Sequence, residues 1–254
     1  MHRKKLMTQL GYIVLLGTLG GCATVAKDPQ DPFEEWNRGV QSFNDHLDNY
    51  LMKPIANGYQ WIIPSFVDRG VTNFFSNIND IGVTINDLLQ FKLAQTGQDG
   101  ARFLVNTTVG IAGFIDVAEK IDLPKHNEDF DQTMGVWGMP SGPYLVLPFF
   151  GPSSPRGVGG MIGDAAMNPI SYLDSGVISG GLFGLNATDL RADNLTNEKI
   201  ATEAAIDRYD FFKSAYLQQR EYLVHDGNMP EGSDLWDIDE DFNKKENMAP
   251  VKPY

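Results

Sequence analysis

The strongest constraint on the fold of this chain is an amphipathic helical pattern that prolines and glycines interrupt at many points. Apolar residues recur at steps of three and four along several segments, which is the period of a helix with one apolar face. The body of the chain contains no uninterrupted apolar run as long as the roughly 18 residues of a spanning helix. The mean hydropathy of the whole chain is −0.24. The sequence therefore predicts a mostly α-helical fold of short helices, without a conventional membrane-spanning helix in the body.

The first of these helices is expected to start at Asp31. Asp31 is a suitable N-cap, Pro32 fits the first helical position, and the carboxylate of Glu34 lies near the positive end of the helix dipole. Pro54 should end or restart this helix, and Pro64 should open a second helical stretch. The apolar positions of the two stretches are Phe33, Trp36, Val40, Phe43, Leu47 and Leu51, and then Phe66, Phe74, Phe75, Ile78, Ile81, Ile85, Leu88 and Leu89.

Irregular backbone is expected from Leu123 to Arg156, where six prolines and four glycines accompany many aromatic and aliphatic residues. Loops are usually polar and exposed, so an apolar one is either buried against the body or faces something apolar outside the protein. Small residues over 157–166 then suit a closely packed helix, and a long helical period runs over 196–224. We also expect a turn over 97–100, and few segments alternate in the manner of a strand.

The first 22 residues have the layout of a bacterial secretory signal that ends in a lipid-attachment site. A short basic stretch precedes apolar residues 6–19, and Leu19-Gly20-Gly21 leads directly to Cys22. This spacing matches the lipobox, in which the cysteine thiol receives diacylglycerol, the signal is cleaved before the cysteine, and the new amino group is acylated. Cys22 is the only cysteine, so the sequence allows neither an intrachain disulfide nor a cysteine-based zinc site.

These features divide the chain into four parts. We expect a cleaved signal peptide over 1–21, a tether over 22–30 with N-acyl and S-diacylglycerol groups on its cysteine, and a folded domain over 31–225. Ala23 follows the cysteine, in place of the aspartate that commonly retains such lipoproteins in the inner membrane, so the outer membrane is the expected destination. Eight acids and three lysines over 226–254 predict a disordered acidic tail.

Charge and motif content argue against nucleic-acid binding and against catalysis. The formal net charge is −13 and the pI about 4.6, whereas nucleic-acid binding requires a basic surface. His46, His126 and His225 are far apart and form no metal-binding motif, and no G-x-S-x-G nucleophile elbow occurs. We therefore predict a protein that is not an enzyme and that has no metal or cofactor beyond its covalent lipid.

Four stretches of the chain together carry a family signature. The most specific runs from Asn127 to Gly138 and continues through Gly142-Pro143-Tyr144-Leu145-Val146-Leu147-Pro148 and Gly151-Pro152-Ser153-Ser154-Pro155-Arg156. The others are Asp31-Pro32-Phe33-Glu34 with Trp36-Asn37-Arg38, Phe103-Leu104-Val105-Asn106-Thr107-Thr108 with Phe114-Ile115-Asp116-Val117-Ala118, and Asn168-Pro169-Ile170-Ser171-Tyr172. Over about 31–224, the chain closely resembles the MlaA/VacJ family of outer-membrane phospholipid-transport lipoproteins.

The resemblance implies a ring-shaped bundle of broken amphipathic helices with a central channel, lying in the inner leaflet of the outer membrane and facing the periplasm. It also implies a function. The protein would remove mislocalised phospholipid from the outer leaflet and pass it through the amphiphilic channel to a periplasmic lipid-carrier protein, which maintains lipid asymmetry. A trimeric porin is the implied neighbour in the membrane, and an inner-membrane ABC-type complex belongs to the same pathway.

The resemblance further suggests roles for three groups of residues, each with a plainer alternative. Possible hinges of a flexible hairpin beside the channel, or else ordinary tight turns, are Gly135, Gly138 and Gly142. Possible contacts to lipid or porin, or else core residues, are Trp137, Tyr144, Phe149 and Phe150. Possible channel-wall residues, or else members of buried pairs, are Asp116, Asp164 and Arg191. Asp131 and Pro140 depart from the family pattern and are expected to reduce the flexibility of the hairpin.

Two other functions remain open from the sequence. The protein could be an envelope scaffold that binds porins without moving lipid, or a phospholipid-degrading enzyme that assembles its catalytic residues from distant segments. The first would lose function when porin contact is lost, even with the channel intact. The second would release fatty acid or lysolipid from phospholipid.

Overall fold

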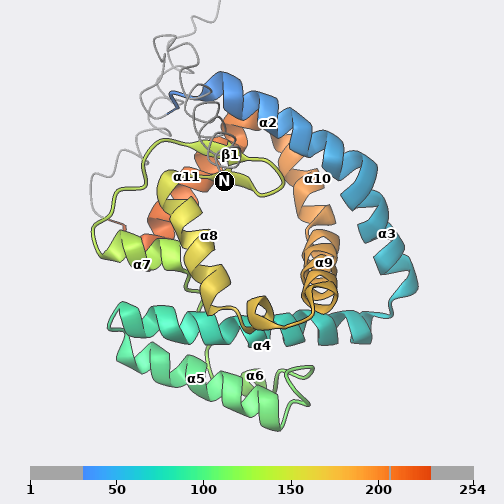
Figure 1. The fold of residues 1–254 in the computed structure, drawn as a ribbon, viewed down its shortest axis with the longest axis vertical. Coiled ribbons are helices and arrows are strands. Elements are labelled where there is room, and N and C mark those ends of the chain that lie inside the picture. Colours follow the sequence, from blue (N-terminus) through green and yellow to red (C-terminus); the bar gives the residue numbers. More distant parts are fainter. Residues whose placement is uncertain (1–30, 206, 230–254) are drawn as a thin grey trace, which may run out of the picture.

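The computed structural model describes residues 31–205 and 207–229, whose helices are arranged in a closed ring (Figure 1). The prediction of a mostly α-helical fold is confirmed. The expected signal peptide, the lipidation site Cys22, the tether and the tail from residue 230 onward lie outside the described residues.

One side of the ring is an almost unbroken helical arc. Its parts are α2 (Glu34–Leu47), the π-helical η2 (Asp48–Met52) and α3 (Lys53–Ile62). The expected N-cap at Asp31 is wrong, because Phe33 occupies the cap position, and Asp31 is buried and accepts a hydrogen bond from Asn37 Nδ2 at 2.9 Å. Pro54 does not break the arc, because it lies in the first turn of α3, where its missing N–H costs little.

The base of the ring in Figure 1 is a pair of antiparallel helices. They are α4 (Ser65–Leu89) and α5 (Leu93–Thr108), and the short α6 (Val117–Lys120) follows them. The turn expected over 97–100 is wrong, because these residues lie inside α5. Each glycine destabilises a helix by about 1 kcal/mol relative to alanine. The packing of α5 along α4 outweighs this cost.

The stretch expected to be irregular contains a helix and a hairpin. The elements are α7 (Phe130–Val136), β1 (Leu145–Leu147) and β2 (Gly151–Ser153), and they lead into α8 (Pro155–Met167) and the 3-10 helix η3 (Pro169–Tyr172). The strands pair antiparallel with Val146 opposite Pro152. The small residues of α8 permit close packing on α7, since a Cβ at Gly160 would lie 2.6 Å from the Cβ of Asp131.

Three helices complete the ring. They are α9 (Gly176–Asp193), which packs on α3 and α4, then α10 (Leu195–Ala204), and α11 (Arg208–Val224), which returns to α7 and the hairpin. The single helix expected over 196–224 is therefore two helices. The second of these, α11, begins after the N-cap residue Asp207, whose side chain accepts hydrogen bonds from the backbone N–H groups of Tyr209 and Asp210.

An ordinary globular protein buries mainly apolar side chains, and this ring shows the opposite distribution. Among the described residues, 18 polar or charged side chains are buried against 11 hydrophobic ones. Large apolar side chains are exposed instead, including Trp61 at 87%, Val177 at 86% and Phe91 at 85%. None of the described helices combines the length and apolarity needed to cross a membrane. The ring thus places polar groups between its helices and many apolar groups on its surface, which marks a surface that meets something apolar.

Candidate functional site

A pocket of about 850 Å³ lies where α2, η2, the hairpin, α9, α10 and the start of α11 meet. We call it the ring pocket. Its volume falls within the roughly 300–1,000 Å³ of typical small-molecule sites. Its lining is amphiphilic, because it contains both aromatic and aliphatic side chains and charged and amide side chains.

The apolar part of the ring pocket centres on the tip of the hairpin. Phe149 and Phe150 line the pocket and are each 69% exposed. Phe149 has a φ of 70°, which is a strained conformation for a bulky residue, and its ring meets the edge of Phe43 at 5.4 Å. Further apolar lining comes from Leu47, Met52, Leu190 and Phe212.

Five charged side chains also line the pocket, and we call them the charged wall: Asp45, Asp48, Arg191, Glu198 and Arg208. Arg191 donates to both oxygens of Asp48, at 2.5 and 2.7 Å, and also to Glu198. Arg208 pairs with Glu198 at 3.0 Å and with Asp45 at 3.3 Å. Burial alone would raise the pKa of Asp48 and Glu198, but pairing with Arg191 outweighs it and lowers both pKa values. Both carboxylates are therefore ionised near neutral pH.

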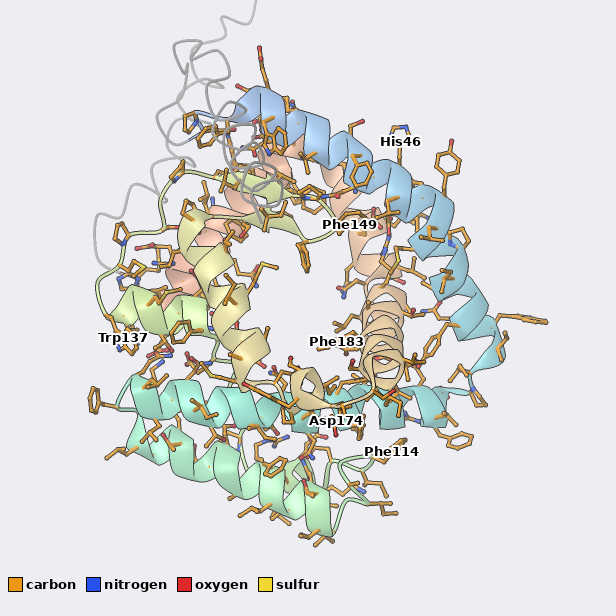
Figure 2. The ribbon with its side chains drawn as sticks, in the orientation of Figure 1. His46, Phe114, Trp137, Phe149, Asp174 and Phe183 are labelled. Atoms are coloured by element: carbon orange, nitrogen blue, oxygen red, sulfur yellow. The ribbon has the colours of Figure 1, made fainter. Side chains whose placement is uncertain are left out.

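A second, more polar pocket of about 610 Å³ adjoins the ring pocket. Gln41, Asp45 and Arg208 line both pockets, so these three side chains form the partition between them. The polar pocket is otherwise bounded by Arg38, His46 and residues near them on α2 and α11. Figure 2 shows His46 on the outer side of α2, away from the middle of the ring.

Two asparagines fasten the hairpin to α2. Asn37 Nδ2 donates to the carbonyl of Tyr144 at 3.0 Å, and its Oδ1 accepts from the N–H of Val146 at 2.8 Å. One heptad later, Asn44 repeats the arrangement with the carbonyl of Leu147 at 2.9 Å and the N–H of Phe149 at 2.8 Å. Each amide thus satisfies one acceptor and one donor of β1 or its turn, as a neighbouring strand would.

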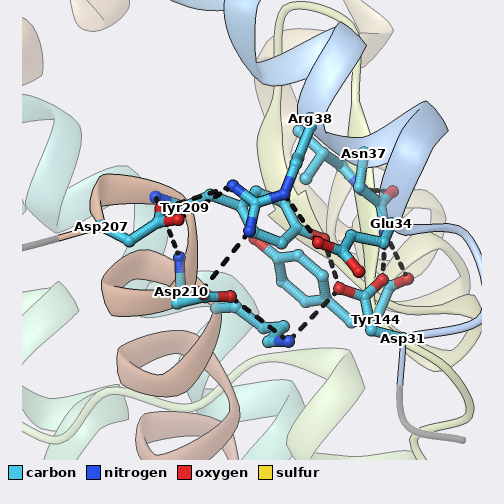
Figure 3. Close-up of polar contacts among 10 residues, drawn as sticks. Asp31, Glu34, Asn37, Arg38, Tyr144, Asp207, Tyr209 and Asp210 are labelled. Carbon is cyan, nitrogen blue, oxygen red and sulfur yellow. Dashed lines mark hydrogen bonds and ion pairs between the residues drawn. The ribbon is translucent and has the colours of Figure 1, made fainter. Parts of the chain in front are cut away.

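The ring closes where α2 meets α11 (Figure 3). Tyr209 donates to buried Asp31 at 2.5 Å, and Arg38 bridges α2 to Asp207 and Asp210 at the start of α11. Tyr144 lies between Tyr209 and Tyr216, with ring centroids 5.9 Å from each. This cluster joins the first and last described helices and supports the hairpin.

The structure separates the four aromatic residues expected at a lipid or porin contact. Phe149 and Phe150 line the ring pocket, whereas Trp137 lies at the outer edge of the ring and donates from Nε1 to the carbonyl of Leu89 (Figure 2). Tyr144 is fully buried, so its assignment to a surface contact is corrected to the core.

The three expected hinge glycines also differ in their surroundings. Gly138 and Gly142 have φ values of +87° and +78°, which L-residues rarely adopt. Gly135 lies inside α7, where a Cβ would come within 2.7 Å of Val224, so it serves close packing rather than a turn.

Of the three candidate wall residues, only Arg191 lines the ring pocket. Asp116 pairs with Arg102 at 2.6 Å and caps α6, and hydrogen bonds together with Arg102 lower its pKa against the effect of burial. Asp164 accepts a hydrogen bond from the N–H of Phe130 at 2.9 Å, and burial raises its pKa to about 6. Asp116 and Asp164 are thus placed as caps and helix contacts away from the pocket.

A buried acidic cluster between α4, α5 and the segment before α7 is a further polar feature. Asp99 accepts from His126 at 2.7 Å, and Glu128 pairs with Lys92 at 2.7 Å. Burial, with Asp99 nearby, raises the pKa of Asp87 to about 7. No group of three or more His, Cys, Asp or Glu side chains suited to a metal ion occurs within 31–205 and 207–229. We therefore assign the cluster a structural role in the packing between helices.

Sequence reasoning missed most of the ring pocket. The charged-wall residues Asp45, Asp48, Glu198 and Arg208 lie up to 163 positions apart, and only the fold brings them together. The seven-residue spacing of Asn37 and Asn44 was a usable signal, because it places two amides on one helix face.

Comparison with known proteins gives consistent matches. Residues 29–223 match the model of the family described as MlaA lipoprotein. The chain is 30% identical over 246 residues to the intermembrane phospholipid transport system lipoprotein MlaA of Haemophilus influenzae, covering 92% of this chain and 96% of that one. It is 32% identical over 223 residues to the protein of the same name from Escherichia coli K12, covering 84% and 88%.

Other matches extend the comparison to an unnamed relative and to a solved fold. An uncharacterised protein of Rickettsia felis is 34% identical over 205 residues, which is 80% of each chain. A solved structure concerning the structural basis for maintenance of bacterial outer membrane lipid asymmetry superposes with a TM-score of 0.68 at 29% identity. The superposition covers 76% of this chain and 98% of the other.

Proposed function

Since the chain belongs to the MlaA lipoprotein family, we propose that it takes mislocalised phospholipid from the outer leaflet of the outer membrane and passes it through the ring to a periplasmic lipid carrier. The family is a component of phospholipid transport and of lipid-asymmetry maintenance at the outer membrane, and it is not a family of enzymes. The route through the ring and its direction are our proposal.

The observation that carries this proposal is the amphiphilic ring pocket. A phospholipid offers an apolar chain region and a charged headgroup at the same time. The ring pocket offers Phe149, Phe150 and Leu190 to the first and the charged wall to the second. A pocket with both linings suits a passing lipid better than a small polar metabolite.

The surface of the ring supports a position in one leaflet. Exposed Trp61, Phe91 and Val177 suit acyl chains, whereas none of the described helices is suited to span the bilayer. We propose that the ring lies in the inner leaflet and that acyl groups on Cys22 anchor it there, facing the periplasm. Exposed Trp137, on the outer edge, is available to lipid or to a trimeric porin.

The hairpin is the element proposed to control access to the pocket. Its tip supplies Phe149 and Phe150, while Gly138 and Gly142 precede β1 in conformations suited to glycine. Movement of the tip would break the two hydrogen bonds that Asn44 makes to it.

The test uses a strain that lacks the gene. Wild-type protein should lower the surface-exposed phospholipid of that strain to the normal level, whereas Cys22→Ala should fail to restore it. A matched variant, Phe150→Glu, should be lipidated and folded and should fail as well, because it places a charge in the apolar part of the pocket. Normal outer-leaflet phospholipid in the deletion strain would refute the transport function. Full rescue by Phe150→Glu would favour a porin scaffold that moves no lipid.

A further inference from the structure

The charged wall of the ring pocket has more acid than base. Asp45, Asp48 and Glu198 face Arg191 and Arg208, which gives the five lining side chains a net charge of −1. Lys53 lies behind them, 3.4 Å from Asp48 and 3.2 Å from Glu198, and it does not line the pocket. A ligand that enters the pocket therefore meets a wall that is neutral to slightly negative.

Arg191 offers no free pair of donors to an anion. Its guanidinium is engaged by both oxygens of Asp48 and by Glu198. The Nη2 of Arg208 is shared by Glu198 and Asp45, whereas its Nε is buried without a hydrogen-bond partner. A phosphate group that binds Arg191 would have to displace a carboxylate, and a phosphate anywhere on the wall would add negative charge to it.

Asp45 is the least satisfied acid of this wall. Among the described residues it forms an ion pair with Arg208 alone, at 3.3 Å, and its side chain is 31% exposed. Burial raises its pKa, Arg208 opposes that effect, and the charges of Glu198 and Asp48 add to it. An additional cation beside Asp45 would stabilise its ionised form.

The surroundings of Asp45 also suit an amphiphile with a cationic head. The exposed aromatic rings of Phe149 and Phe150 line the same pocket and suit the acyl chains of such an amphiphile. The side-chain amides of Gln41 and Asn197 line it too and make no hydrogen bond to another described residue, so they are free to bind phosphate or ester oxygens. From the polar pocket, Arg38, His46 and Asp207 are the nearest charged or titratable lining groups.

We propose that the charged wall selects the headgroup: the ring pocket binds phospholipids whose headgroup is zwitterionic with an ammonium group in preference to phospholipids with a net negative headgroup, and Asp45 is the specificity-determining residue. This inference rests on the function proposed above, because it names the class of lipid that the conduit takes.

The experiment uses the full-length, lipidated protein purified in detergent. The protein is incubated with an equimolar mixture of phosphatidylethanolamine and phosphatidylglycerol with identical acyl chains, and retained lipid is counted by mass spectrometry after repurification. We expect wild-type protein to retain phosphatidylethanolamine about fivefold over phosphatidylglycerol. Asp45→Asn should bring the ratio near one, and Asp45→Lys should reverse it.

Asp174→Asn is the matched control, because Asp174 is exposed between η3 and α9 and lines neither pocket. It removes the same charge and should leave the ratio at the wild-type value, and all variants should keep the wild-type melting temperature. A wild-type ratio of one, or a ratio that Asp45→Asn and Asp45→Lys leave unchanged, overturns the selection while leaving lipid transport standing. Retention of neither lipid by wild-type protein refutes the proposed function itself.

Discussion

The attachment of the hairpin to α2 predicts that two similar asparagine substitutions have very different effects. Asn37 is fully buried and makes three hydrogen bonds, to Asp31, to the carbonyl of Tyr144 and from the N–H of Val146. Asn44 makes two such bonds near the exposed tip of the hairpin. Replacing each residue with alanine removes the same kind of contact from two environments that differ in access to water.

The expected magnitudes follow from that difference. A net hydrogen bond is worth about 1 kcal/mol, and a buried group left unsatisfied costs about 1–3 kcal/mol more. Asn37→Ala should therefore destabilise the whole ring by roughly 3–5 kcal/mol, which lowers the melting temperature by about 10 °C or more in a chain of this size. Asn44→Ala should weaken only the tip, by about 1–2 kcal/mol, because water can reach the freed groups there.

Thermal unfolding and amide hydrogen exchange together test this prediction. Asn44→Ala should increase exchange of the Phe149 N–H, which donates to Asn44, by about tenfold and leave the melting temperature near that of wild type. Asn44→Asp is the matched control, since it keeps the acceptor for the N–H of Phe149 and loses the donor to Leu147. Equal losses of melting temperature for Asn37→Ala and Asn44→Ala would refute the reasoning, because the tip would then not be a separable element.

Three further predictions concern packing, pH and the pocket. Gly160→Ala should lower the free energy of unfolding by about 1–3 kcal/mol, because its Cβ would clash with Asp131. The Cβ of Gly184→Ala in α9 meets nothing within 4 Å, so this variant should stabilise the protein by about 0.5–1 kcal/mol. Urea unfolding compares the two variants. Burial raises the folded-state pKa of Asp164 to about 6, above its unfolded value near 4. Between these two pH values the folded state binds more protons than the unfolded state, so the free energy of unfolding falls as the pH rises from about 4 to 6. Asp164→Asn should therefore gain stability relative to wild type by about 2–3 kcal/mol between pH 4 and pH 7, and a flat difference across that range would contradict the assignment. Phe150→Glu should keep the far-ultraviolet circular dichroism of wild type, since Phe150 is largely exposed, and should still fail to restore lipid asymmetry.

Local sequence signals predicted the helical class, and they failed where tertiary contacts dominate. The apolar period of α2 and α4 was readable because each helix carries its own amphipathic pattern. The glycines over 97–100 suggested a turn, but packing against α4 holds them in α5. Asp207, a good N-cap inside an apparently continuous period, is the local signal that divides α10 from α11.

The candidate site was less predictable than the fold. The aromatic residues of the hairpin were recognisable by type, but the sequence could not show that Tyr144 is fully buried against Tyr209 and Tyr216 while Phe149 and Phe150 are largely exposed. The charged wall combines α2, η2, α9, α10 and α11, so no local spacing encodes it. Arg191 was singled out as a wall or pair residue, and the fold places it in both settings.

Photocross-linking from inside the ring pocket tests the central claim most directly. A photoreactive amino acid at Ala187, which is exposed on α9 and lines the pocket, reports what occupies it in living cells. We expect a covalent phospholipid adduct at this position, detected by mass spectrometry, in protein that still maintains lipid asymmetry. A functional protein that gives no lipid adduct at Ala187 would contradict passage of phospholipid through the ring.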